Sequence, residues 1–203
     1  SSEKNRPLNS AFTASSVVEC LNIYRFDLAA QAVYEFTWYE FCDWHLEFSK
    51  TVLQSNTSSA DEIRGTRRTL VETLETILRL LHPLMPFITE EIWQRVAPLA
   101  AKAGPSIMLQ PYPQADSARI DHGAIAEMEW VQKFINGIRN LRGEYNVSPA
   151  QTLAGVLVED ASATDKAHLS KHEPLLTGGA AIGSLTKVVS LSLLATGSTP
   201  PPS

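Results

Sequence analysis

The sequence predicts a mainly α-helical fold, a helical bundle followed by a small α/β appendage, and three observations lead to this prediction. Apolar residues recur at steps of three or four along much of the chain, which is the spacing of the buried stripe of a helix. Prolines and polar stretches interrupt this pattern, as expected for corners between helices. Near the C-terminus the pattern changes to two β-like runs around one polar helix. The predicted division is a bundle over residues 1–150, a strand-helix-strand appendage over 151–195 and a disordered tail over 196–203.

The first part of the bundle is predicted to contain a weak helix over residues 8–23 and a long helix over residues 27–52. Asp27 is a residue type favoured at helix N-caps, so we expect it to cap the long helix. This helix carries apolar residues on more than one side and is therefore predicted to lie at the centre of the bundle. Trp38 and Trp44 belong to this apolar pattern and are expected in the core. The main stripe comprises Ala30, Tyr34, Trp38, Phe41, His45, Phe48 and Val52, and a second set facing elsewhere comprises Ala29, Val33 and Phe36.

A helix, a break and a new helix are predicted around residues 82–94. The preceding apolar residues step at helical spacing, and Pro83 and Pro86 then remove backbone donors and end that helix. Thr89 is expected to cap the next helix. Glu90 and Glu91 then lie in its first turn, where the positive end of the helix dipole favours negative charge. Beyond this corner the sequence predicts an extended connector over residues 100–118, a last long helix over 125–145, a strand over 153–158, a helix over 163–176 and a strand over 185–191.

Composition sets bounds on function. The formal charge of −5 argues against a surface that binds nucleic acid everywhere, although cations concentrated at one place can still do so. Cys20 and Cys42 are the only cysteines and lie in apolar helical patterns, so we expect reduced core thiols and a cytoplasmic protein. No apolar run of membrane-spanning length and no secretory leader occur, so no membrane partner is expected.

Three segments resemble a known family. Residues 82–94 read HPLMPFITEEIWQ, which closely resembles the anticodon-binding helical bundle shared by the class I aminoacyl-tRNA synthetases for valine, isoleucine and leucine. Residues 24–47 and 137–149 resemble the valine-specific branch, the valyl-tRNA synthetases, in particular. The resemblance implies a domain that recognises the anticodon stem and loop of a valine tRNA and contacts the remaining domains of a synthetase. ATP and Mg²⁺ are implied only for the complete enzyme, and no DNA partner is expected.

The sequence contains no recognisable catalytic site. The resemblance implies two ATP-binding motifs in a complete synthetase, of the His-Ile-Gly-His and Lys-Met-Ser-Lys-Ser types, and neither occurs here. No glycine-rich phosphate loop follows a predicted strand, so we assign no catalytic residue and no cofactor to this chain. His168 and His172 share a helical face without a third ligand, and we interpret them as a surface pair and assign no metal site. The chain is therefore expected to bind and not to catalyse.

A domain that reads an anticodon loop needs cations for phosphates, flat side chains for unstacked bases and polar groups for base edges. Two clusters offer these groups. The first, on the last long helix, comprises Lys133, Arg139, Arg142, Tyr145 and Asn146, and the second, at the end of the central helix and the start of the next, comprises Lys50, Arg64, Arg67 and Arg68.

Alternatives remain open for both clusters and for the chain. The arginines of the first cluster could pair with the acidic row Glu40, Asp43 and Glu47, and the second cluster could be a solvated face. The chain could be a helical scaffold or protein-interaction module that binds no RNA by itself. It could also be the equivalent domain of an isoleucine or leucine enzyme.

Overall fold

The computed structural model describes residues 10–116, 118, 120–148, 151, 156–158, 161–176 and 191–193. The chain divides into two compact units, Ser1–His122 and Gly123–Ser203, which we call unit 1 and unit 2. The boundary after residue 150, and the tail over 196–203, stay predictions, and the tail lies outside the described residues.

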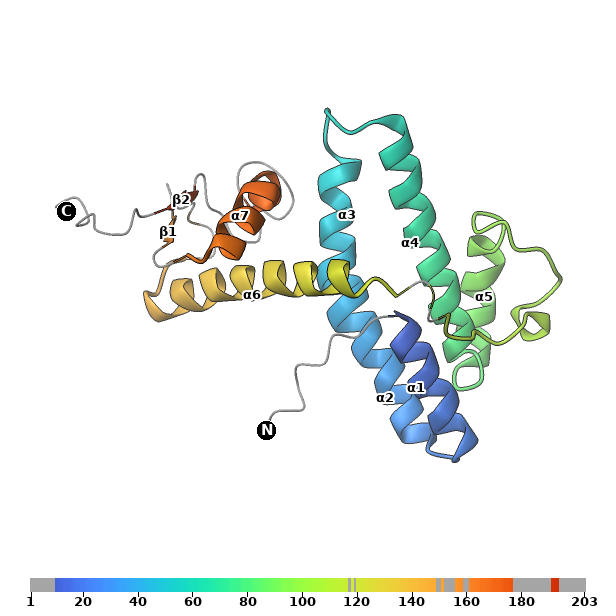
Figure 1. Cartoon of the computed structure of the whole chain (residues 1–203). Helices are drawn as coiled ribbons and strands as arrows, with labels where there is room; N and C mark the ends of the chain where they lie inside the picture. The colour runs from blue at the N-terminus through green and yellow to red at the C-terminus, as the bar shows by residue number, and fades with distance from the viewer. Residues whose placement is uncertain are drawn as a thin grey trace. The chain divides into compact units, whose positions relative to one another are not determined.

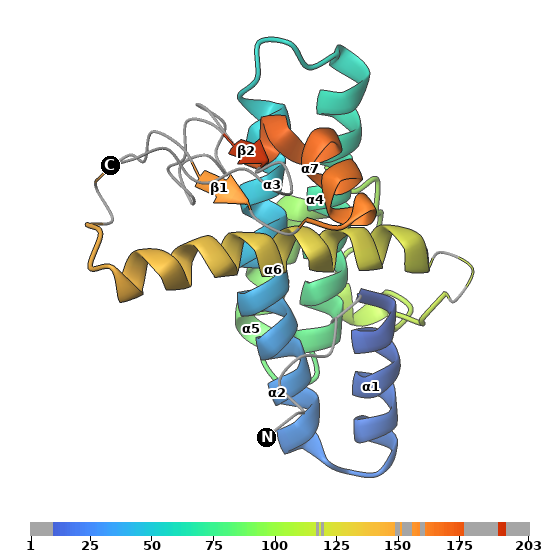
Figure 2. The same cartoon turned by 60° about the vertical axis from the view of Figure 1, so that its left-hand side comes forward.

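Unit 1 consists of helical hairpins (Figure 1). Helix α1 (Ser10–Asn22) turns back on α2 (Phe26–Glu35), as Figure 2 also shows. The chain continues without a break from α2 through a π-helical segment, η1 (Phe36–His45), into α3 (Leu46–Leu53). Helix α4 (Ala60–Leu81) packs against α3, and α5 (Pro86–Val96) packs against α4. A short 3-10 turn, η2 (Ile107–Leu109), contacts α5 from within the predicted connector. The mainly α-helical class is confirmed.

The core of unit 1 lies between α1, the α2–η1–α3 helix and α4. Its buried members come from α1, α2, η1 and α4, so the continuous helix packs against both α1 and α4. A second cluster joins α4, α5 and η2 through Leu78, Trp93, Ala97 and Ile107. The main cluster comprises Ala14, Val17, Ala29, Val33, Phe36, Phe41, Ile77 and Leu80.

The predicted main stripe of the long helix is wrong in its first half. Tyr34 and Trp38 are 59% and 54% exposed, whereas Ala29, Val33 and Phe36 of the second set are buried. The π-helical segment that follows changes the spacing of the buried residues, since each of its turns contains more residues than an α-helical turn. Phe36 and Phe41, five positions apart, are therefore both buried. A period of 3.6 residues could not predict this shift.

The two predicted caps at Asp27 and Thr89 are also wrong. Arg25 occupies the N-cap position of α2, and the Asp27 carboxylate accepts hydrogen bonds from its guanidinium at 2.9 and 2.8 Å. This bond holds the pKa of Asp27 at about 2. Helix α5 begins at Pro86, because proline lacks an N–H and its fixed φ suits the first helical position. Thr89 thus lies inside the helix and donates to the Met85 carbonyl at 2.7 Å.

Helix α4 begins with a capping box. The Ser59 hydroxyl accepts a hydrogen bond from the Glu62 backbone N–H at 3.2 Å, and the Glu62 carboxylate accepts one from the Ser59 N–H at 2.8 Å. The helix ends at Leu81, just before Pro83, as predicted. The cap and the proline together set the length of α4.

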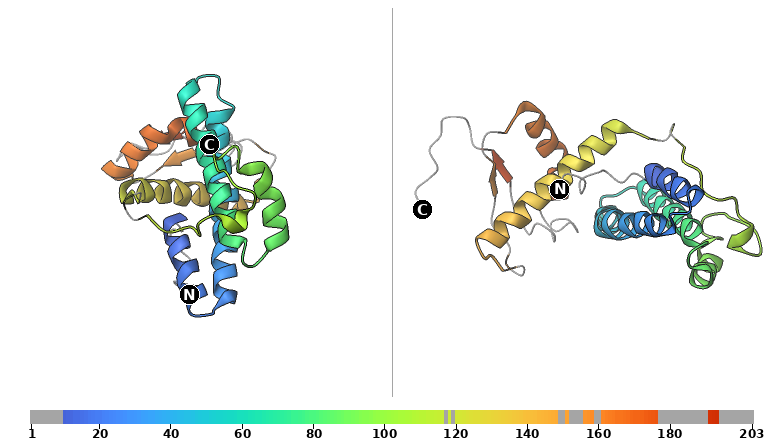
Figure 3. Two further views of the ribbon diagram at one scale, coloured as in Figure 1. Left: turned by 90° about the vertical axis from the view of Figure 1, so that its right-hand side faces the viewer. Right: turned by 90° about the horizontal axis from the view of Figure 1, so that it is seen from below.

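Unit 2 consists of α6 (His122–Glu144), β1 (Val156–Val158), α7 (Ala163–Leu176) and β2 (Leu191–Leu193) (Figure 3). The two strands pair in parallel with Val156 opposite Leu191, so a strand-helix-strand arrangement is present, although the second described strand overlaps the predicted one only at Leu191. Residues 153–155 and 185–190 of the predicted strands lie outside the described residues. Side chains of α6 and α7 meet where the Trp130 Nε1–H donates to the Asp165 carboxylate at 2.7 Å.

His168 and His172 are not the surface pair expected from the sequence. His172 is 8% exposed, and its Nε2 lies 2.6 Å from the Glu127 carboxylate on α6. The His168 ring packs edge-on against Trp130, with ring centroids 5.0 Å apart. Within the described residues, no group of three or more His, Cys, Asp and Glu side chains is placed to hold a metal ion.

Cys20 and Cys42 are free thiols, partly buried against the main core of unit 1. Burial raises the pKa of the Cys42 thiol, which lowers its fraction of reactive thiolate. None of the described helices is long and apolar enough to cross a membrane.

Candidate nucleic-acid interface

The polar side chains of residues 82–94 hold the corner between α4 and α5. His82 Nδ1 lies 2.8 Å from the Thr89 hydroxyl across the break. The Glu90 carboxylate accepts hydrogen bonds from Gln94 at 2.6 Å, from the Ser106 hydroxyl at 2.8 Å and from the Ile107 N–H at 3.1 Å. The hydrogen bond from Gln94, followed by those from Ser106 and the Ile107 N–H, keeps the pKa of Glu90 below its usual value. The string that carries the family resemblance is thus a structural element of the bundle.

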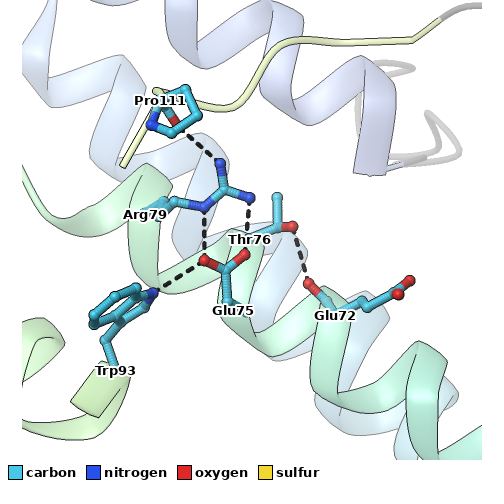
Figure 4. A network of polar contacts seen from close by, with 6 residues as sticks. All are labelled: Glu72, Glu75, Thr76, Arg79, Trp93 and Pro111. Carbon is cyan, nitrogen blue, oxygen red and sulfur yellow. Dashed lines mark hydrogen bonds and ion pairs between the residues drawn. The ribbon is translucent and has the colours of Figure 1, made fainter. Parts of the chain in front are cut away.

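A buried ion pair stabilises the same region (Figure 4). The Glu75 side chain is 1% exposed and accepts two hydrogen bonds from Arg79, both at 2.8 Å. The Trp93 Nε1–H also donates to this carboxylate at 3.0 Å. Arg79 donates in turn to the Pro111 carbonyl at 2.7 Å. One carboxylate and one guanidinium therefore join α4, α5 and the connector.

The end of α6 displays an aromatic ring and an amide. Asn146 has a φ of +51°, in the left-handed region that asparagine tolerates better than most residues. Its N–H donates to the Gly143 carbonyl at 3.2 Å, and the Val147 N–H donates to the Arg142 carbonyl at 2.8 Å. This pattern is a Schellman motif, which ends the helix. Tyr145, just before it, is 77% exposed.

The cations of this cluster differ in their environment. Lys133 and Arg139 are exposed on α6. Arg142 is only 8% exposed, and its Nη2 donates to the carbonyls of Ser148 and Gln151, both at 2.6 Å. The structure therefore separates Arg142 from Arg139, although both were grouped on one face from their spacing. Arg142 holds the turn that follows the helix.

The second cluster lies where α3 and α4 meet the linker between them (Figure 1). Three of its cations have carboxylate partners on their own helix. Lys50 pairs with Glu47, Arg64 with Asp61, and Arg68 with Glu72 at 2.7 Å. Arg67 is exposed and has no ion-pair partner among the described residues. All four cations are exposed, so their charges reach solvent.

The two predicted clusters belong to different units, with the first in unit 2 and the second in unit 1. The sequence showed the cations but not which of them are buried or paired. One signal was available for pairing, because Asp61, Glu47 and Glu72 stand three or four residues from their arginine or lysine partners. The burial of Arg142 left no such signal, since its partners are backbone carbonyls.

Comparison with known proteins defines the class. Residues 11–157 match the model of the family described as the anticodon-binding domain of tRNA ligase. The chain belongs to this family. It is also 48% identical over 159 residues to a valine–tRNA ligase of Coxiella burnetii (strain RSA 493 / Nine Mile phase I). The alignment covers 78% of this chain and 17% of that relative, so the chain spans about a sixth of the relative's length.

Proposed function

We propose that this chain is the tRNA-recognition part of a valine–tRNA ligase and binds the anticodon stem and loop of a valine tRNA. The observation that carries the proposal is the 48% identity to such a ligase across most of the chain, within a family of anticodon-binding domains. The ligation of valine, with ATP and Mg²⁺, is assigned to other parts of that ligase, because the residues here include no glycine-rich phosphate loop.

The C-terminal end of α6 supports RNA contact through three exposed groups. Arg139 supplies a charge for phosphate, Tyr145 a ring for an unstacked base, and Asn146 an amide that can match a base edge. Lys133 lies further back on the same helix and adds positive charge. Arg142 would act indirectly, by holding the turn that presents Tyr145 and Asn146.

The cluster of Lys50, Arg64, Arg67 and Arg68 would track a phosphate strand. The carboxylates beside Lys50, Arg64 and Arg68 offset part of their attraction for phosphate. Arg67 has no ion-pair partner among the described residues, so it should contribute more to phosphate binding than the other three cations. Each phosphate contact that is lost should reduce the slope of log affinity against log salt by about 0.7 to 0.9.

The test is a titration of the chain with a valine tRNA and with the same tRNA carrying an altered anticodon, at low and moderate salt. Asn146→Gly is the sharpest variant, because glycine accepts the positive φ and only the amide is removed. Arg139→Ala and Tyr145→Ala remove the other two groups. Arg67→Ala and Arg68→Ala form a matched pair, because Arg67 has no ion-pair partner in the described part of the chain and Arg68 is bound to Glu72.

Tighter binding to the correct anticodon, reduced by Asn146→Gly and Tyr145→Ala, would establish the function and place base recognition at the end of α6. Arg67→Ala should weaken the binding of both RNAs equally, and by more than Arg68→Ala does. Equal binding to both RNAs would contradict anticodon recognition. No binding at low salt by the folded chain would favour the scaffold alternative, and preference for an isoleucine or leucine anticodon would favour those ligases.

A further inference from the structure

The long helix of unit 1 carries an aromatic pair on its outer side. Tyr34 and Trp38 are 59% and 54% exposed, and their rings stack almost parallel, with an interplanar angle of 4° and centroids 6.4 Å apart. Tyr39, beside them in sequence, is 51% exposed. Large aromatic surfaces left in water are a common mark of binding sites, because burying them is strongly favourable.

The charge around this pair is entirely acidic along the helix. Residues 26–49 contain Asp27, Glu35, Glu40, Asp43 and Glu47 and no lysine or arginine. Asp27 is neutralised by Arg25, and Glu47 by Lys50, both from just outside this stretch. Asp43 is exposed and has no ion-pair partner among the described residues. RNA phosphates would be repelled here, so the stacked rings do not suit a nucleic acid.

The exposed tryptophan and tyrosine rings, with acidic groups beside them, are complementary to a protein surface that carries lysine or arginine. An arginine or lysine can lie over the face of Trp38 in a cation–π contact while its charge approaches Asp43. Its aliphatic stem can cover the apolar surface of the rings. The carboxylate at Glu35, which accepts a hydrogen bond from Gln31 at 2.8 Å, offers a further acceptor at the edge.

We propose that Tyr34, Trp38 and Asp43 form a docking surface for a lysine- or arginine-bearing surface of the ligase polypeptide outside residues 1–203. The inference rests on the proposed function, because it requires that the chain works within a longer ligase. The matched relative is long enough to supply such a partner, since the aligned segment is 17% of it. The surface is distinct from the cations and Tyr145 proposed to contact RNA.

The test is photocrosslinking in the complete ligase polypeptide, with and without valine tRNA. Tyr34→benzoylphenylalanine is expected to crosslink to a peptide that contains lysine or arginine and lies outside residues 1–203, whether or not tRNA is present. The matched control is Tyr145→benzoylphenylalanine, another exposed tyrosine, which is expected to crosslink to tRNA. Asp43→Lys should reduce the Tyr34 crosslink about fivefold, whereas Glu19→Lys, on exposed α1 surface, should leave it unchanged.

The outcomes separate the two proposals. The docking surface would be overturned if position 34 crosslinked to tRNA, to a second copy of the chain or to a site within residues 1–203. It would also be overturned if no crosslink formed, or if Asp43→Lys left the crosslink unchanged. If Tyr145 fails to reach tRNA while Tyr34 reaches a basic peptide, the docking surface stands and the RNA site fails. Trp38→Ala, with an unchanged circular dichroism spectrum, should reduce the Tyr34 crosslink as Asp43→Lys does.

Discussion

Replacing Arg79 by methionine should strongly destabilise unit 1, because it leaves the Glu75 carboxylate buried without its counter-charge. The variant loses two charge-assisted hydrogen bonds of 2.8 Å to Glu75 and one of 2.7 Å to the Pro111 carbonyl. Of the described donors to this carboxylate, which is 1% exposed, the Trp93 Nε1–H alone remains. Removing one partner of a buried pair costs about 3 to 5 kcal/mol, and the 13% exposure of Arg79 places the expected loss near the lower end, about 3 kcal/mol.

The measurement is the free energy of unfolding in urea. A Trp130→Phe background leaves three of the four tryptophans, all in unit 1, so that their fluorescence reports that unit. Arg68→Met is the matched control, since Arg68 also pairs with a glutamate four residues away on α4 but is exposed, and it should change the stability little. Adding Glu75→Gln to Arg79→Met should recover part of the loss, because the buried charge is then gone. Equal effects of Arg79→Met and Arg68→Met would refute the reasoning.

Three further predictions concern local geometry and ionisation. Tyr24→Gly should raise the unfolding free energy by about 1 kcal/mol, since Tyr24 has a φ of +59° that only glycine adopts without strain; a lower thermal midpoint would contradict this. Ser59→Ala should cost about 1 kcal/mol through loss of the capping box, measured by thermal unfolding, and a neutral result would mean that α4 does not depend on it. Burial raises the pKa of Tyr112 from 10.0 to about 12, so the stability it contributes is complete below pH 10 and lost between pH 10 and 12. An alkaline titration should show one late tyrosine that disappears in Tyr112→Phe.

Much of the fold could be predicted from periodicity and breaks. The predicted helices over 163–176 and from the end of the polar linker at 54–61 to about residue 82 match α7 and α4, because prolines, caps and apolar spacing act within a few residues along the chain. The caps at Asp27 and Thr89 failed for a related reason. Each residue type suits a cap, but Arg25 captures the Asp27 carboxylate and Pro86 starts α5 earlier.

The candidate site was less predictable than the fold. Spacing placed Arg139 and Arg142 together, yet one is exposed and the other is buried against two backbone carbonyls that follow the helix. Likewise Trp38 fitted an apolar stripe, but a competing set of apolar residues at nearly the same spacing is the one that is buried. Two overlapping stripes on one helix cannot be ranked without knowing which neighbours pack against it.

The sequence by itself determined the mainly helical class, the corner at Pro83 and Pro86, and the family resemblance of residues 82–94, because backbone restrictions and local spacing carry these signals. Only the tertiary structure decided that Glu75 would be buried beneath Arg79 and Trp93, and that Tyr34 and Trp38 would face solvent. Burial depends on which surfaces of distant segments meet, and that is a property of packing that no local pattern contains.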